Sequence, residues 1–197
     1  MDDKATVLTE VCAALAEDRT SEAGAILRDR YPFVPLANVK RKYSVRQMLA
    51  IFIRDGFIDR YSGRRLVCPA TLRLISKRLP EHFPFHSNWR FDACHFAYWE
   101  LSPTIDHRTP VKRSGDDDES NWITTSMLRN AAKSVFTLDE LGWSLHPPGD
   151  LNEWDGLTGW FVNQAKVDSA ILTDPYLQQW YRVARENPYF TRLFPSY

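Results

Sequence analysis

Hydrophobic positions in the first third of the chain recur at helical spacing, and polar capping residues stand at the ends of these segments. We expect a helix over residues 3–17, followed by a second one from Ser21 to about Arg30. A third helix is expected in VRQMLAIFIRD, with Ser44 as its N-cap and Gly56 as a left-handed residue at its end. The apolar stripe of the first helix consists of Val7, Leu8, Val11, Cys12 and Leu15.

The middle of the chain alternates between turns and short elements. In IDRYSGRRLVCP, Ser62 and Gly63 lie between β-prone flanks, which predicts a tight hairpin turn. Thr71 can cap a short helix that ends at Pro80. We expect an ordered loop from Pro80 to Asp92, and the periodicity of CHFAYWEL does not decide between helix and strand.

The segment PTIDHRTPVKRSGDDDESNWITTSMLRNAAK predicts a strand, a polar loop, a second strand and a helix. TIDH and NWITT are the β runs, and SMLRNAAKS opens the helix. Further on, Thr137 and Glu140 have the spacing of a capping box, and Gly142 should end that short helix. Two more helices are expected over Glu153–Val167 and Pro175–Arg185.

Composition limits the class of protein. The 197 residues are 44% hydrophobic, enough for one compact core. No run of eighteen apolar residues occurs, and the start, MDDKATVLTE, lacks the basic and then apolar pattern of a signal peptide, so we expect a cytoplasmic protein without a membrane partner. The three cysteines form no CxxC pair, so a metal would have to be held mainly by oxygen or histidine.

Charge is unevenly distributed, although the whole chain sums to zero. Residues 28–78 hold thirteen basic and three acidic residues, a net charge of +10, so the remainder carries −10. Interleaved aromatic residues make this segment suited to a nucleic-acid backbone. The alternative is a set of solvated helix faces that pair with the acidic remainder. The basic residues are Arg28, Arg30, Lys40, Arg41, Lys42, Arg46, Arg54, Arg60, Arg64, Arg65, Arg73, Lys77 and Arg78.

Four polar residues in the strand–loop–strand–helix segment have chemistry in common with a phosphodiesterase site. Asp106 and Asn130 offer the hard oxygen ligands that Mg²⁺ prefers, and Asn121 could brace the loop between them. His107 can take a proton from water near pH 7. One metal and one base are the minimum parts for hydrolysing a phosphodiester bond.

This segment resembles the HNH endonucleases of the ββα-metal fold, and among them the HNH domains of CRISPR effector nucleases, which also have Asn at the third position. The family pattern is Asp-His, a Pro three residues after the His, a Gly-containing loop, a central Asn, an Asn or His nine residues on, and a Lys three residues after that. The matching positions are Asp106, His107, Pro110, Gly115, Asn121, Asn130 and Lys133, with every interval kept.

The resemblance implies a role for each matched residue. His107 would be the general base, Asp106 and Asn130 the ligands of one Mg²⁺ or Mn²⁺ ion, and Asn121 the residue that orients His107 or its loop. Lys133 would contact phosphate or support the helix. The CxxC pairs that clamp many HNH proteins with structural zinc are missing here, so zinc is not expected.

Two segments would therefore have to be joined without a metal. We hypothesise that an Asp59–Arg129 ion pair and hydroxyl hydrogen bonds replace the zinc clamp, so that IDRYSGRRL packs beside the motif.

The function expected from this resemblance is that of a Mg²⁺-dependent endonuclease that cuts DNA, double-stranded by preference. Besides Lys133, we expect phosphate contacts from Lys112, Arg113, Arg64 and Arg65. A homodimer would explain double-strand breaks. Two alternatives remain: a non-catalytic nucleic-acid-binding module with the same basic segment, and a nuclease toxin with a neutralising protein partner.

Some neighbouring residues have two interpretations. Asp116, Asp117 and Asp118 could ligate a metal, although an acidic run beside a glycine is more often solvated. His82, His86 and His95 could touch substrate, or be packed and surface residues. Trp122 should pack under the site.

The expected fold class is α+β, with a ββα-metal core embedded in N- and C-terminal α-helices. The helical N-terminal region would span 1–57, the nuclease core 58–145 and the C-terminal helical region 146–197. We expect the three regions to form a single compact unit.

Overall fold

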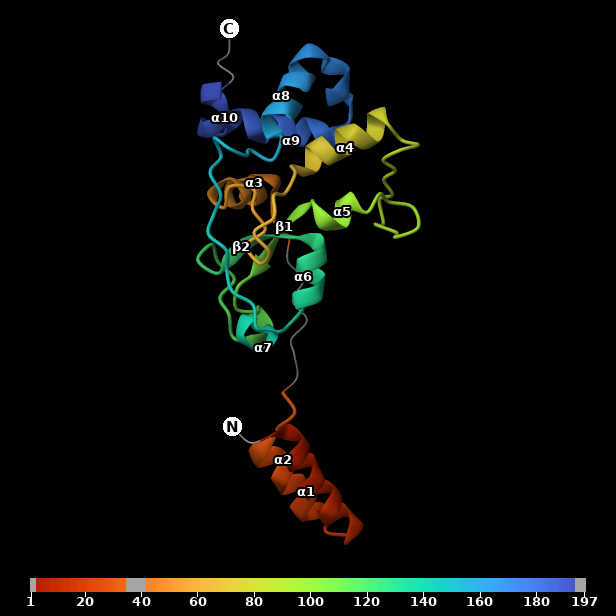
Figure 1. Ribbon diagram of the computed structural model, residues 1–197, viewed down its shortest axis with the longest axis vertical. Coiled ribbons are helices and arrows are strands. Elements are labelled where there is room, and N and C mark those ends of the chain that lie inside the picture. Colours follow the sequence, from red (N-terminus) through yellow and green to blue (C-terminus); the bar gives the residue numbers. More distant parts are fainter. Residues whose placement is uncertain (1–2, 35–41, 194–197) are drawn as a thin grey trace. The chain divides into compact units, whose positions relative to one another are not determined.

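The computed structural model describes residues 3–34 and 42–193 (Figure 1). It is a mixed α+β protein with one two-stranded antiparallel sheet among the described residues. The chain divides into two compact units, residues 1–39 and residues 40–197, where the sequence led us to expect one. The boundaries expected at 57 and 145 both lie inside the second unit. Lys40 and Arg41 of the basic segment lie outside the described residues.

The first unit is a pair of helices, α1 (Lys4–Ala16) and α2 (Thr20–Arg30), joined by a short turn. Asp3 caps α1, because its carboxylate accepts a hydrogen bond from the Ala5 N–H. The buried stripe of α1 packs on Ala23 of α2. Ser21, the expected cap of the second helix, instead lies inside α2, which begins one residue earlier without a side-chain cap.

The second unit begins with α3 (Val45–Arg54), and both of its ends follow the sequence signals. The Ser44 hydroxyl accepts from the Gln47 N–H, while the Gln47 side chain accepts from the Ser44 N–H. Gly56 has φ +64°, and a Cβ there would lie 2.2 Å from the carbonyl oxygen of Gly149. Glycine is needed at this position for both reasons.

The expected tight turn is present after α3. Ile58 and Arg65 form an antiparallel β-bridge, the Asp59 N–H donates to the Arg64 carbonyl, and the Leu66 N–H donates to the Phe57 carbonyl. The side chain of Asp59 in this turn also accepts hydrogen bonds from the distant strand β2 (Trp122–Ser126). The next helix, α4 (Pro69–Arg78), starts two residues before the expected cap Thr71. The ambiguous segment CHFAYWEL contains a one-turn helix, α5 (Ala97–Glu100).

The predicted strand, loop, strand and helix are all present. Strand β1 (Pro103–His107) pairs antiparallel with β2, and His107 lies opposite Trp122. The connecting loop contains a 3₁₀ turn, η1 (Val111–Arg113). Helix α6 (Met127–Lys133) follows β2 at once, with the Ser126 hydroxyl accepting from the Arg129 N–H.

The rest of the second unit is helical. It consists of α7 (Leu138–Leu141), α8 (Thr158–Val167), η2 (Ser169–Thr173), α9 (Pro175–Glu186) and α10 (Pro188–Leu193). The expected capping box of Thr137 and Glu140 and the left-handed Gly142 enclose α7. Helix α8 begins five residues later than Glu153, because the backbone turns with positive φ at Gly156 and Leu157.

Both faces of the small sheet are in contact with a helix. Helix α3 contacts both strands and also α9, while α6 contacts both strands (Figure 1). Phe52 of α3 stacks on Trp180 of α9 with ring centroids 6.4 Å apart, within the main buried cluster. Helix α3 thus connects the strand pair to α9. In the described part of the chain, no helix combines the length and the apolar character needed to cross a bilayer.

Candidate functional site

The end of β1 and the middle of α6 meet at one pocket. Asp106, His107 and Asn130 line it together with Lys112 and Tyr43. Its volume is about 300 Å³. The sequence predicted that the first three of these residues converge, and the structure brings them together around this pocket.

Asp106 is buried, and one of its two carboxylate oxygens is engaged twice. Its Oδ2 accepts a hydrogen bond from the Tyr61 hydroxyl at 2.6 Å and lies 3.0 Å from Nζ of Lys133. Burial and the negative charge of Asp106 raise the pKa of Tyr61, so this hydroxyl stays protonated and continues to donate. Both of these contacts are made by Oδ2, and Asp106 also lines the pocket.

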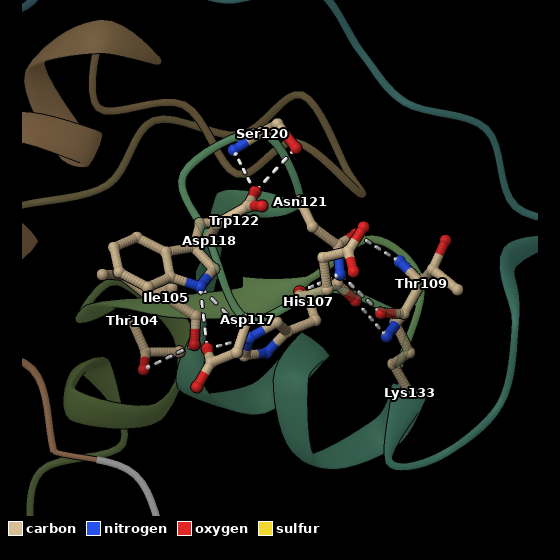
Figure 2. A network of polar contacts seen from close by, with 11 residues as sticks. Thr104, Ile105, His107, Thr109, Asp117, Asp118, Ser120, Asn121, Trp122 and Lys133 are labelled. Atoms are coloured by element: carbon tan, nitrogen blue, oxygen red, sulfur yellow. Dashed lines mark hydrogen bonds and ion pairs between the residues drawn. The ribbon is translucent and has the colours of Figure 1, made fainter. Parts of the chain in front are cut away.

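Lys133 is completely buried. Besides Asp106, its ammonium group donates to the main-chain carbonyl of His107 at 2.8 Å (Figure 2). A lysine placed in this way does not reach a nucleic-acid phosphate, which corrects one of its two expected roles. Its contacts fit the other role, because they tie α6 to the end of β1.

His107 is also buried, and the loop between the strands supplies its partner. Nε2 of its ring lies 2.7 Å from Oδ1 of Asp117. The indole N–H of Trp122 lies 3.1 Å from the same ring nitrogen and 3.1 Å from the same carboxylate oxygen. Figure 2 shows the three side chains grouped at the end of the strand pair where the loop joins β1 to β2. Trp122 packs beneath the site as expected, with its ring edge-on to Tyr43.

Asn121 braces the loop between β1 and β2. Its Oδ1 accepts from the Thr109 N–H at 2.9 Å, and its Nδ2 donates to the carbonyls of Thr109 and Asp116, both at 2.8 Å (Figure 2). Gly115 passes close to these groups, since a Cβ there would lie 2.0 Å from the Thr109 carbonyl oxygen. Asn121 was expected to orient either His107 or its loop, and its hydrogen bonds hold the loop.

The hypothesised Asp59–Arg129 ion pair is wrong. Asp59 is buried and accepts hydrogen bonds from the Thr125 hydroxyl and the N–H groups of Tyr61 and Ser126. Arg129 lies over the ring of Trp143 instead. The turn after α3 is thus joined to the end of β2 by hydrogen bonds to one carboxylate, and IDRYSGRRL does pack beside the motif. Three donors satisfy a buried carboxylate without a counter-ion.

We compared the chain with models of protein families, with curated proteins and with solved structures. None of the three comparisons found a match. The case for a function therefore rests on the residues and their geometry.

Many side chains of the basic segment form ion pairs with acidic residues. Six of its residues, Arg30, Arg46, Arg54, Arg60, Lys77 and Arg78, contact acidic side chains. For about half of the basic segment, this supports the alternative in which basic helix faces pair with the acidic remainder of the chain. Arg64 and Arg65 are exposed, and Arg65 lies over the ring of Trp154. Of the two loop residues, Lys112 lines the pocket and Arg113 pairs with Glu140.

The acidic run in the loop has divided roles. Asp117 contacts His107, and Asp118 accepts from the N–H and hydroxyl of Ser120, which lowers the pKa of Asp118. Within residues 3–34 and 42–193, no three His, Cys, Asp or Glu side chains gather as a metal site. Of the histidines before the motif, His95 stacks on Phe83 with ring centroids 4.3 Å apart.

Sequence reasoning did not foresee two contacts of the site. Tyr61 is the donor to Asp106, and Asp117, considered from the sequence only as a metal ligand, is the partner of His107. The segment IDRYSGRRL was expected beside the motif, but nothing in the sequence identifies its Tyr61, 45 positions before Asp106, as the donor. Asp117 could have been found, since a buried base generally needs an acceptor for its second ring nitrogen, and the acidic run lies in the loop that follows His107.

Proposed function

We propose that this protein is a divalent-metal-dependent endonuclease that hydrolyses phosphodiester bonds of DNA, with β1, β2 and α6 as a ββα-metal core. The observation that carries the proposal is the convergence of Asp106, His107 and Asn130 on one pocket. A binding module without catalysis gives no reason for two oxygen ligands and an imidazole to meet in this way.

The donor set suits a hard cation such as Mg²⁺ or Mn²⁺. Oδ1 of Asp106 and the amide oxygen of Asn130 would hold it, while Tyr61 and Lys133 fix the other oxygen of Asp106. Two protein ligands leave most positions to water and substrate phosphate, as is usual for Mg²⁺. Because Lys133 offsets the charge of Asp106, we expect weak binding without substrate. The bound cation would stabilise the negative charge that develops on the phosphate.

His107 would act as the base. It takes a proton from a water molecule as the water oxygen bonds to phosphorus. The bond from phosphorus to the leaving sugar oxygen breaks, and that oxygen then gains a proton from solvent. Lys133 holds the carbonyl of His107 and so fixes the backbone from which the imidazole projects. General-base catalysis of this kind contributes about 10²–10⁴-fold in rate.

DNA, preferably double-stranded, is the proposed substrate. The route through water does not need a 2′-hydroxyl on the substrate. Lys112 lies at the pocket and can contact the phosphate next to the scissile one, while the exposed Arg64 and Arg65 offer further phosphate contacts. With six of the basic residues engaged in ion pairs, we expect a small number of phosphate contacts and moderate salt dependence.

A nicking assay on supercoiled plasmid tests the proposal. The purified protein should nick the plasmid with Mg²⁺ or Mn²⁺ and should not do so with EDTA. His107→Ala should lower the rate by about 10²-fold or more, whereas His82→Ala, a histidine outside the pocket, should retain it. Equal activity of wild type and His107→Ala, or no activity in any variant, would contradict the proposal.

A further inference from the structure

The imidazole of His107 and two polar groups beside it form a closed set of contacts. Oδ1 of Asp117 lies 2.7 Å from Nε2 of His107, and Nε1 of Trp122 lies 3.1 Å from both of these atoms. The rings of His107 and Trp122 are buried, whereas the side chain of Asp117 is 43% exposed and comes from the loop (Figure 2). The arrangement combines a rigid ring pair with one carboxylate from a loop.

These contacts determine where the imidazole proton lies. An indole N–H can only donate, and an ionised carboxylate can only accept. If Nε2 of His107 had no hydrogen, its lone pair would face the carboxylate at 2.7 Å with no proton between them. We therefore assign the hydrogen to Nε2, from which it is donated to Asp117. Trp122 donates to the same carboxylate oxygen, and Nδ1 of His107 is left with a lone pair.

We propose that Asp117 is the positioning residue of His107. Its carboxylate accepts the Nε2 hydrogen and prevents the Trp122 N–H from bonding to Nε2, so that Nδ1 remains the nitrogen that accepts the proton of the attacking water. This inference rests on the proposed function. Asp117 does not touch the substrate. It fixes the ring orientation and the tautomer through one hydrogen bond, in the way that carboxylates orient other histidine bases and ligands.

The role of Trp122 makes the proposal specific. If Asp117 is shortened to alanine, the nearest acceptor for the indole N–H becomes Nε2 of His107, 3.1 Å away. Accepting that hydrogen bond requires Nε2 to have no proton, so the proton moves to Nδ1, where it blocks the base. A donor that is harmless beside Asp117 therefore becomes inhibitory without it.

The experiment combines four variants with two readouts. They are Asp117→Ala, Trp122→Phe, the double variant, and Asp116→Ala as a matched control that removes one carboxylate from the adjacent loop position. We expect Asp117→Ala to lower kcat for plasmid nicking by about 10²-fold with KM changed by about twofold or less. Asp116→Ala should stay within about twofold of wild type, because its side chain does not contact His107.

Adding Trp122→Phe to Asp117→Ala should raise kcat above that of Asp117→Ala alone, because the inhibitory donor is gone. A purely structural role of the two residues predicts the opposite, since a second core change would only add damage. Wild-type kcat in Asp117→Ala, an equal loss in Asp116→Ala, or no recovery in the double variant would overturn the inference.

The second readout does not depend on activity, so it separates failure of this inference from failure of the proposed function. Nitrogen-15 NMR of labelled histidine reports which ring nitrogen carries the proton, and a His107→Ala spectrum assigns the signal among the five histidines. We expect protonated Nε2 in wild type and protonated Nδ1 in Asp117→Ala. Protonated Nδ1 in wild type would overturn the inference even if the protein cuts DNA.

Discussion

Among single residues, Lys133 shows most directly how the site is built. A buried ammonium group is costly unless it is paired and hydrogen-bonded. Its Nζ meets both conditions, with the carboxylate of Asp106 at 3.0 Å and the carbonyl of His107 at 2.8 Å. The same two contacts link α6 to the two consecutive residues of β1 on which the proposed chemistry depends.

Lys133→Met should therefore destabilise the protein strongly. The substitution leaves the buried carboxylate of Asp106 without its counter-charge and the carbonyl of His107 without its donor, and we expect a loss of about 3–5 kcal/mol in the free energy of unfolding. Urea denaturation followed by tryptophan fluorescence measures this loss. The control is Lys77→Met, which removes the half-exposed partner of Asp174 and should cost less than about 1 kcal/mol. Similar losses for the two variants would show that Lys133 is not the buried link described here.

Among the elements, the loop between β1 and β2 has the tightest steric requirement. Asn121 closes it with three hydrogen bonds, and Gly115 passes within a distance that no side chain allows. The loop also supplies Asp117 to His107 and Lys112 to the pocket. Its conformation thus couples directly to the site.

Gly115→Ala should impair both the loop and the activity. A Cβ 2.0 Å from the Thr109 carbonyl must displace the loop backbone, so we expect nicking to fall at least about tenfold and stability to fall by about 1–3 kcal/mol. The matched control is Gly24→Ala in the middle of α2, where a Cβ meets nothing within 4 Å. That change should stabilise its helix by up to about 1 kcal/mol. Full activity of Gly115→Ala would contradict the close approach.

Helix α9 offers a prediction about pH. Partial burial acts to raise the pKa of Asp174, but hydrogen bonds from Lys77 and from the N–H groups at the start of α9 outweigh it, and the pKa is lowered. A lowered pKa means that the charged form stabilises the fold. The stabilisation is present above the unfolded value of about 3.9 and is lost as the pH falls through the lowered folded value.

Asp174→Asn keeps a capping oxygen but cannot ionise. We expect it to be about 1 kcal/mol less stable than wild type at pH 7, because the ion pair and the helix-dipole interaction are lost. The difference should shrink below about pH 4 and vanish in stronger acid. Denaturation curves at a series of pH values measure it, and a difference that does not change with pH would contradict the assignment.

On the scale of the whole molecule, the sequence predicts structure that depends on neighbouring residues better than it predicts contacts between distant residues. The capping boxes at Ser44 and Thr137 and the strand–loop–strand–helix order were predictable, because each depends on neighbouring residues. The partners of Asp59 were not, since its bonds to β2 join residues up to 67 positions apart. The turn at Ser62 and Gly63, by contrast, was predictable, because its backbone hydrogen bonds join nearby residues on either side of it.

The same difference applies to the candidate site, part of which was predictable from the sequence. The spacing of Asp106, His107 and Asn130 predicted their convergence, since strand pairing and the following helix bring these positions together. Of the two roles expected for Lys133, its burial excludes the phosphate contact, and the sequence gives no measure of that burial. Net charge was misleading in a similar way, because about half of the basic residues pair with acidic side chains, one of them 140 positions away.

The most direct test of the account is anomalous diffraction from crystals grown with Mn²⁺. We expect one strong peak within coordination distance of Oδ1 of Asp106 and the amide oxygen of Asn130, and its loss in Asp106→Ala. A peak at Asp116–Asp118 instead, or none near Asp106 at a saturating Mn²⁺ concentration, would contradict the central claim that this pocket is a metal-dependent nuclease site.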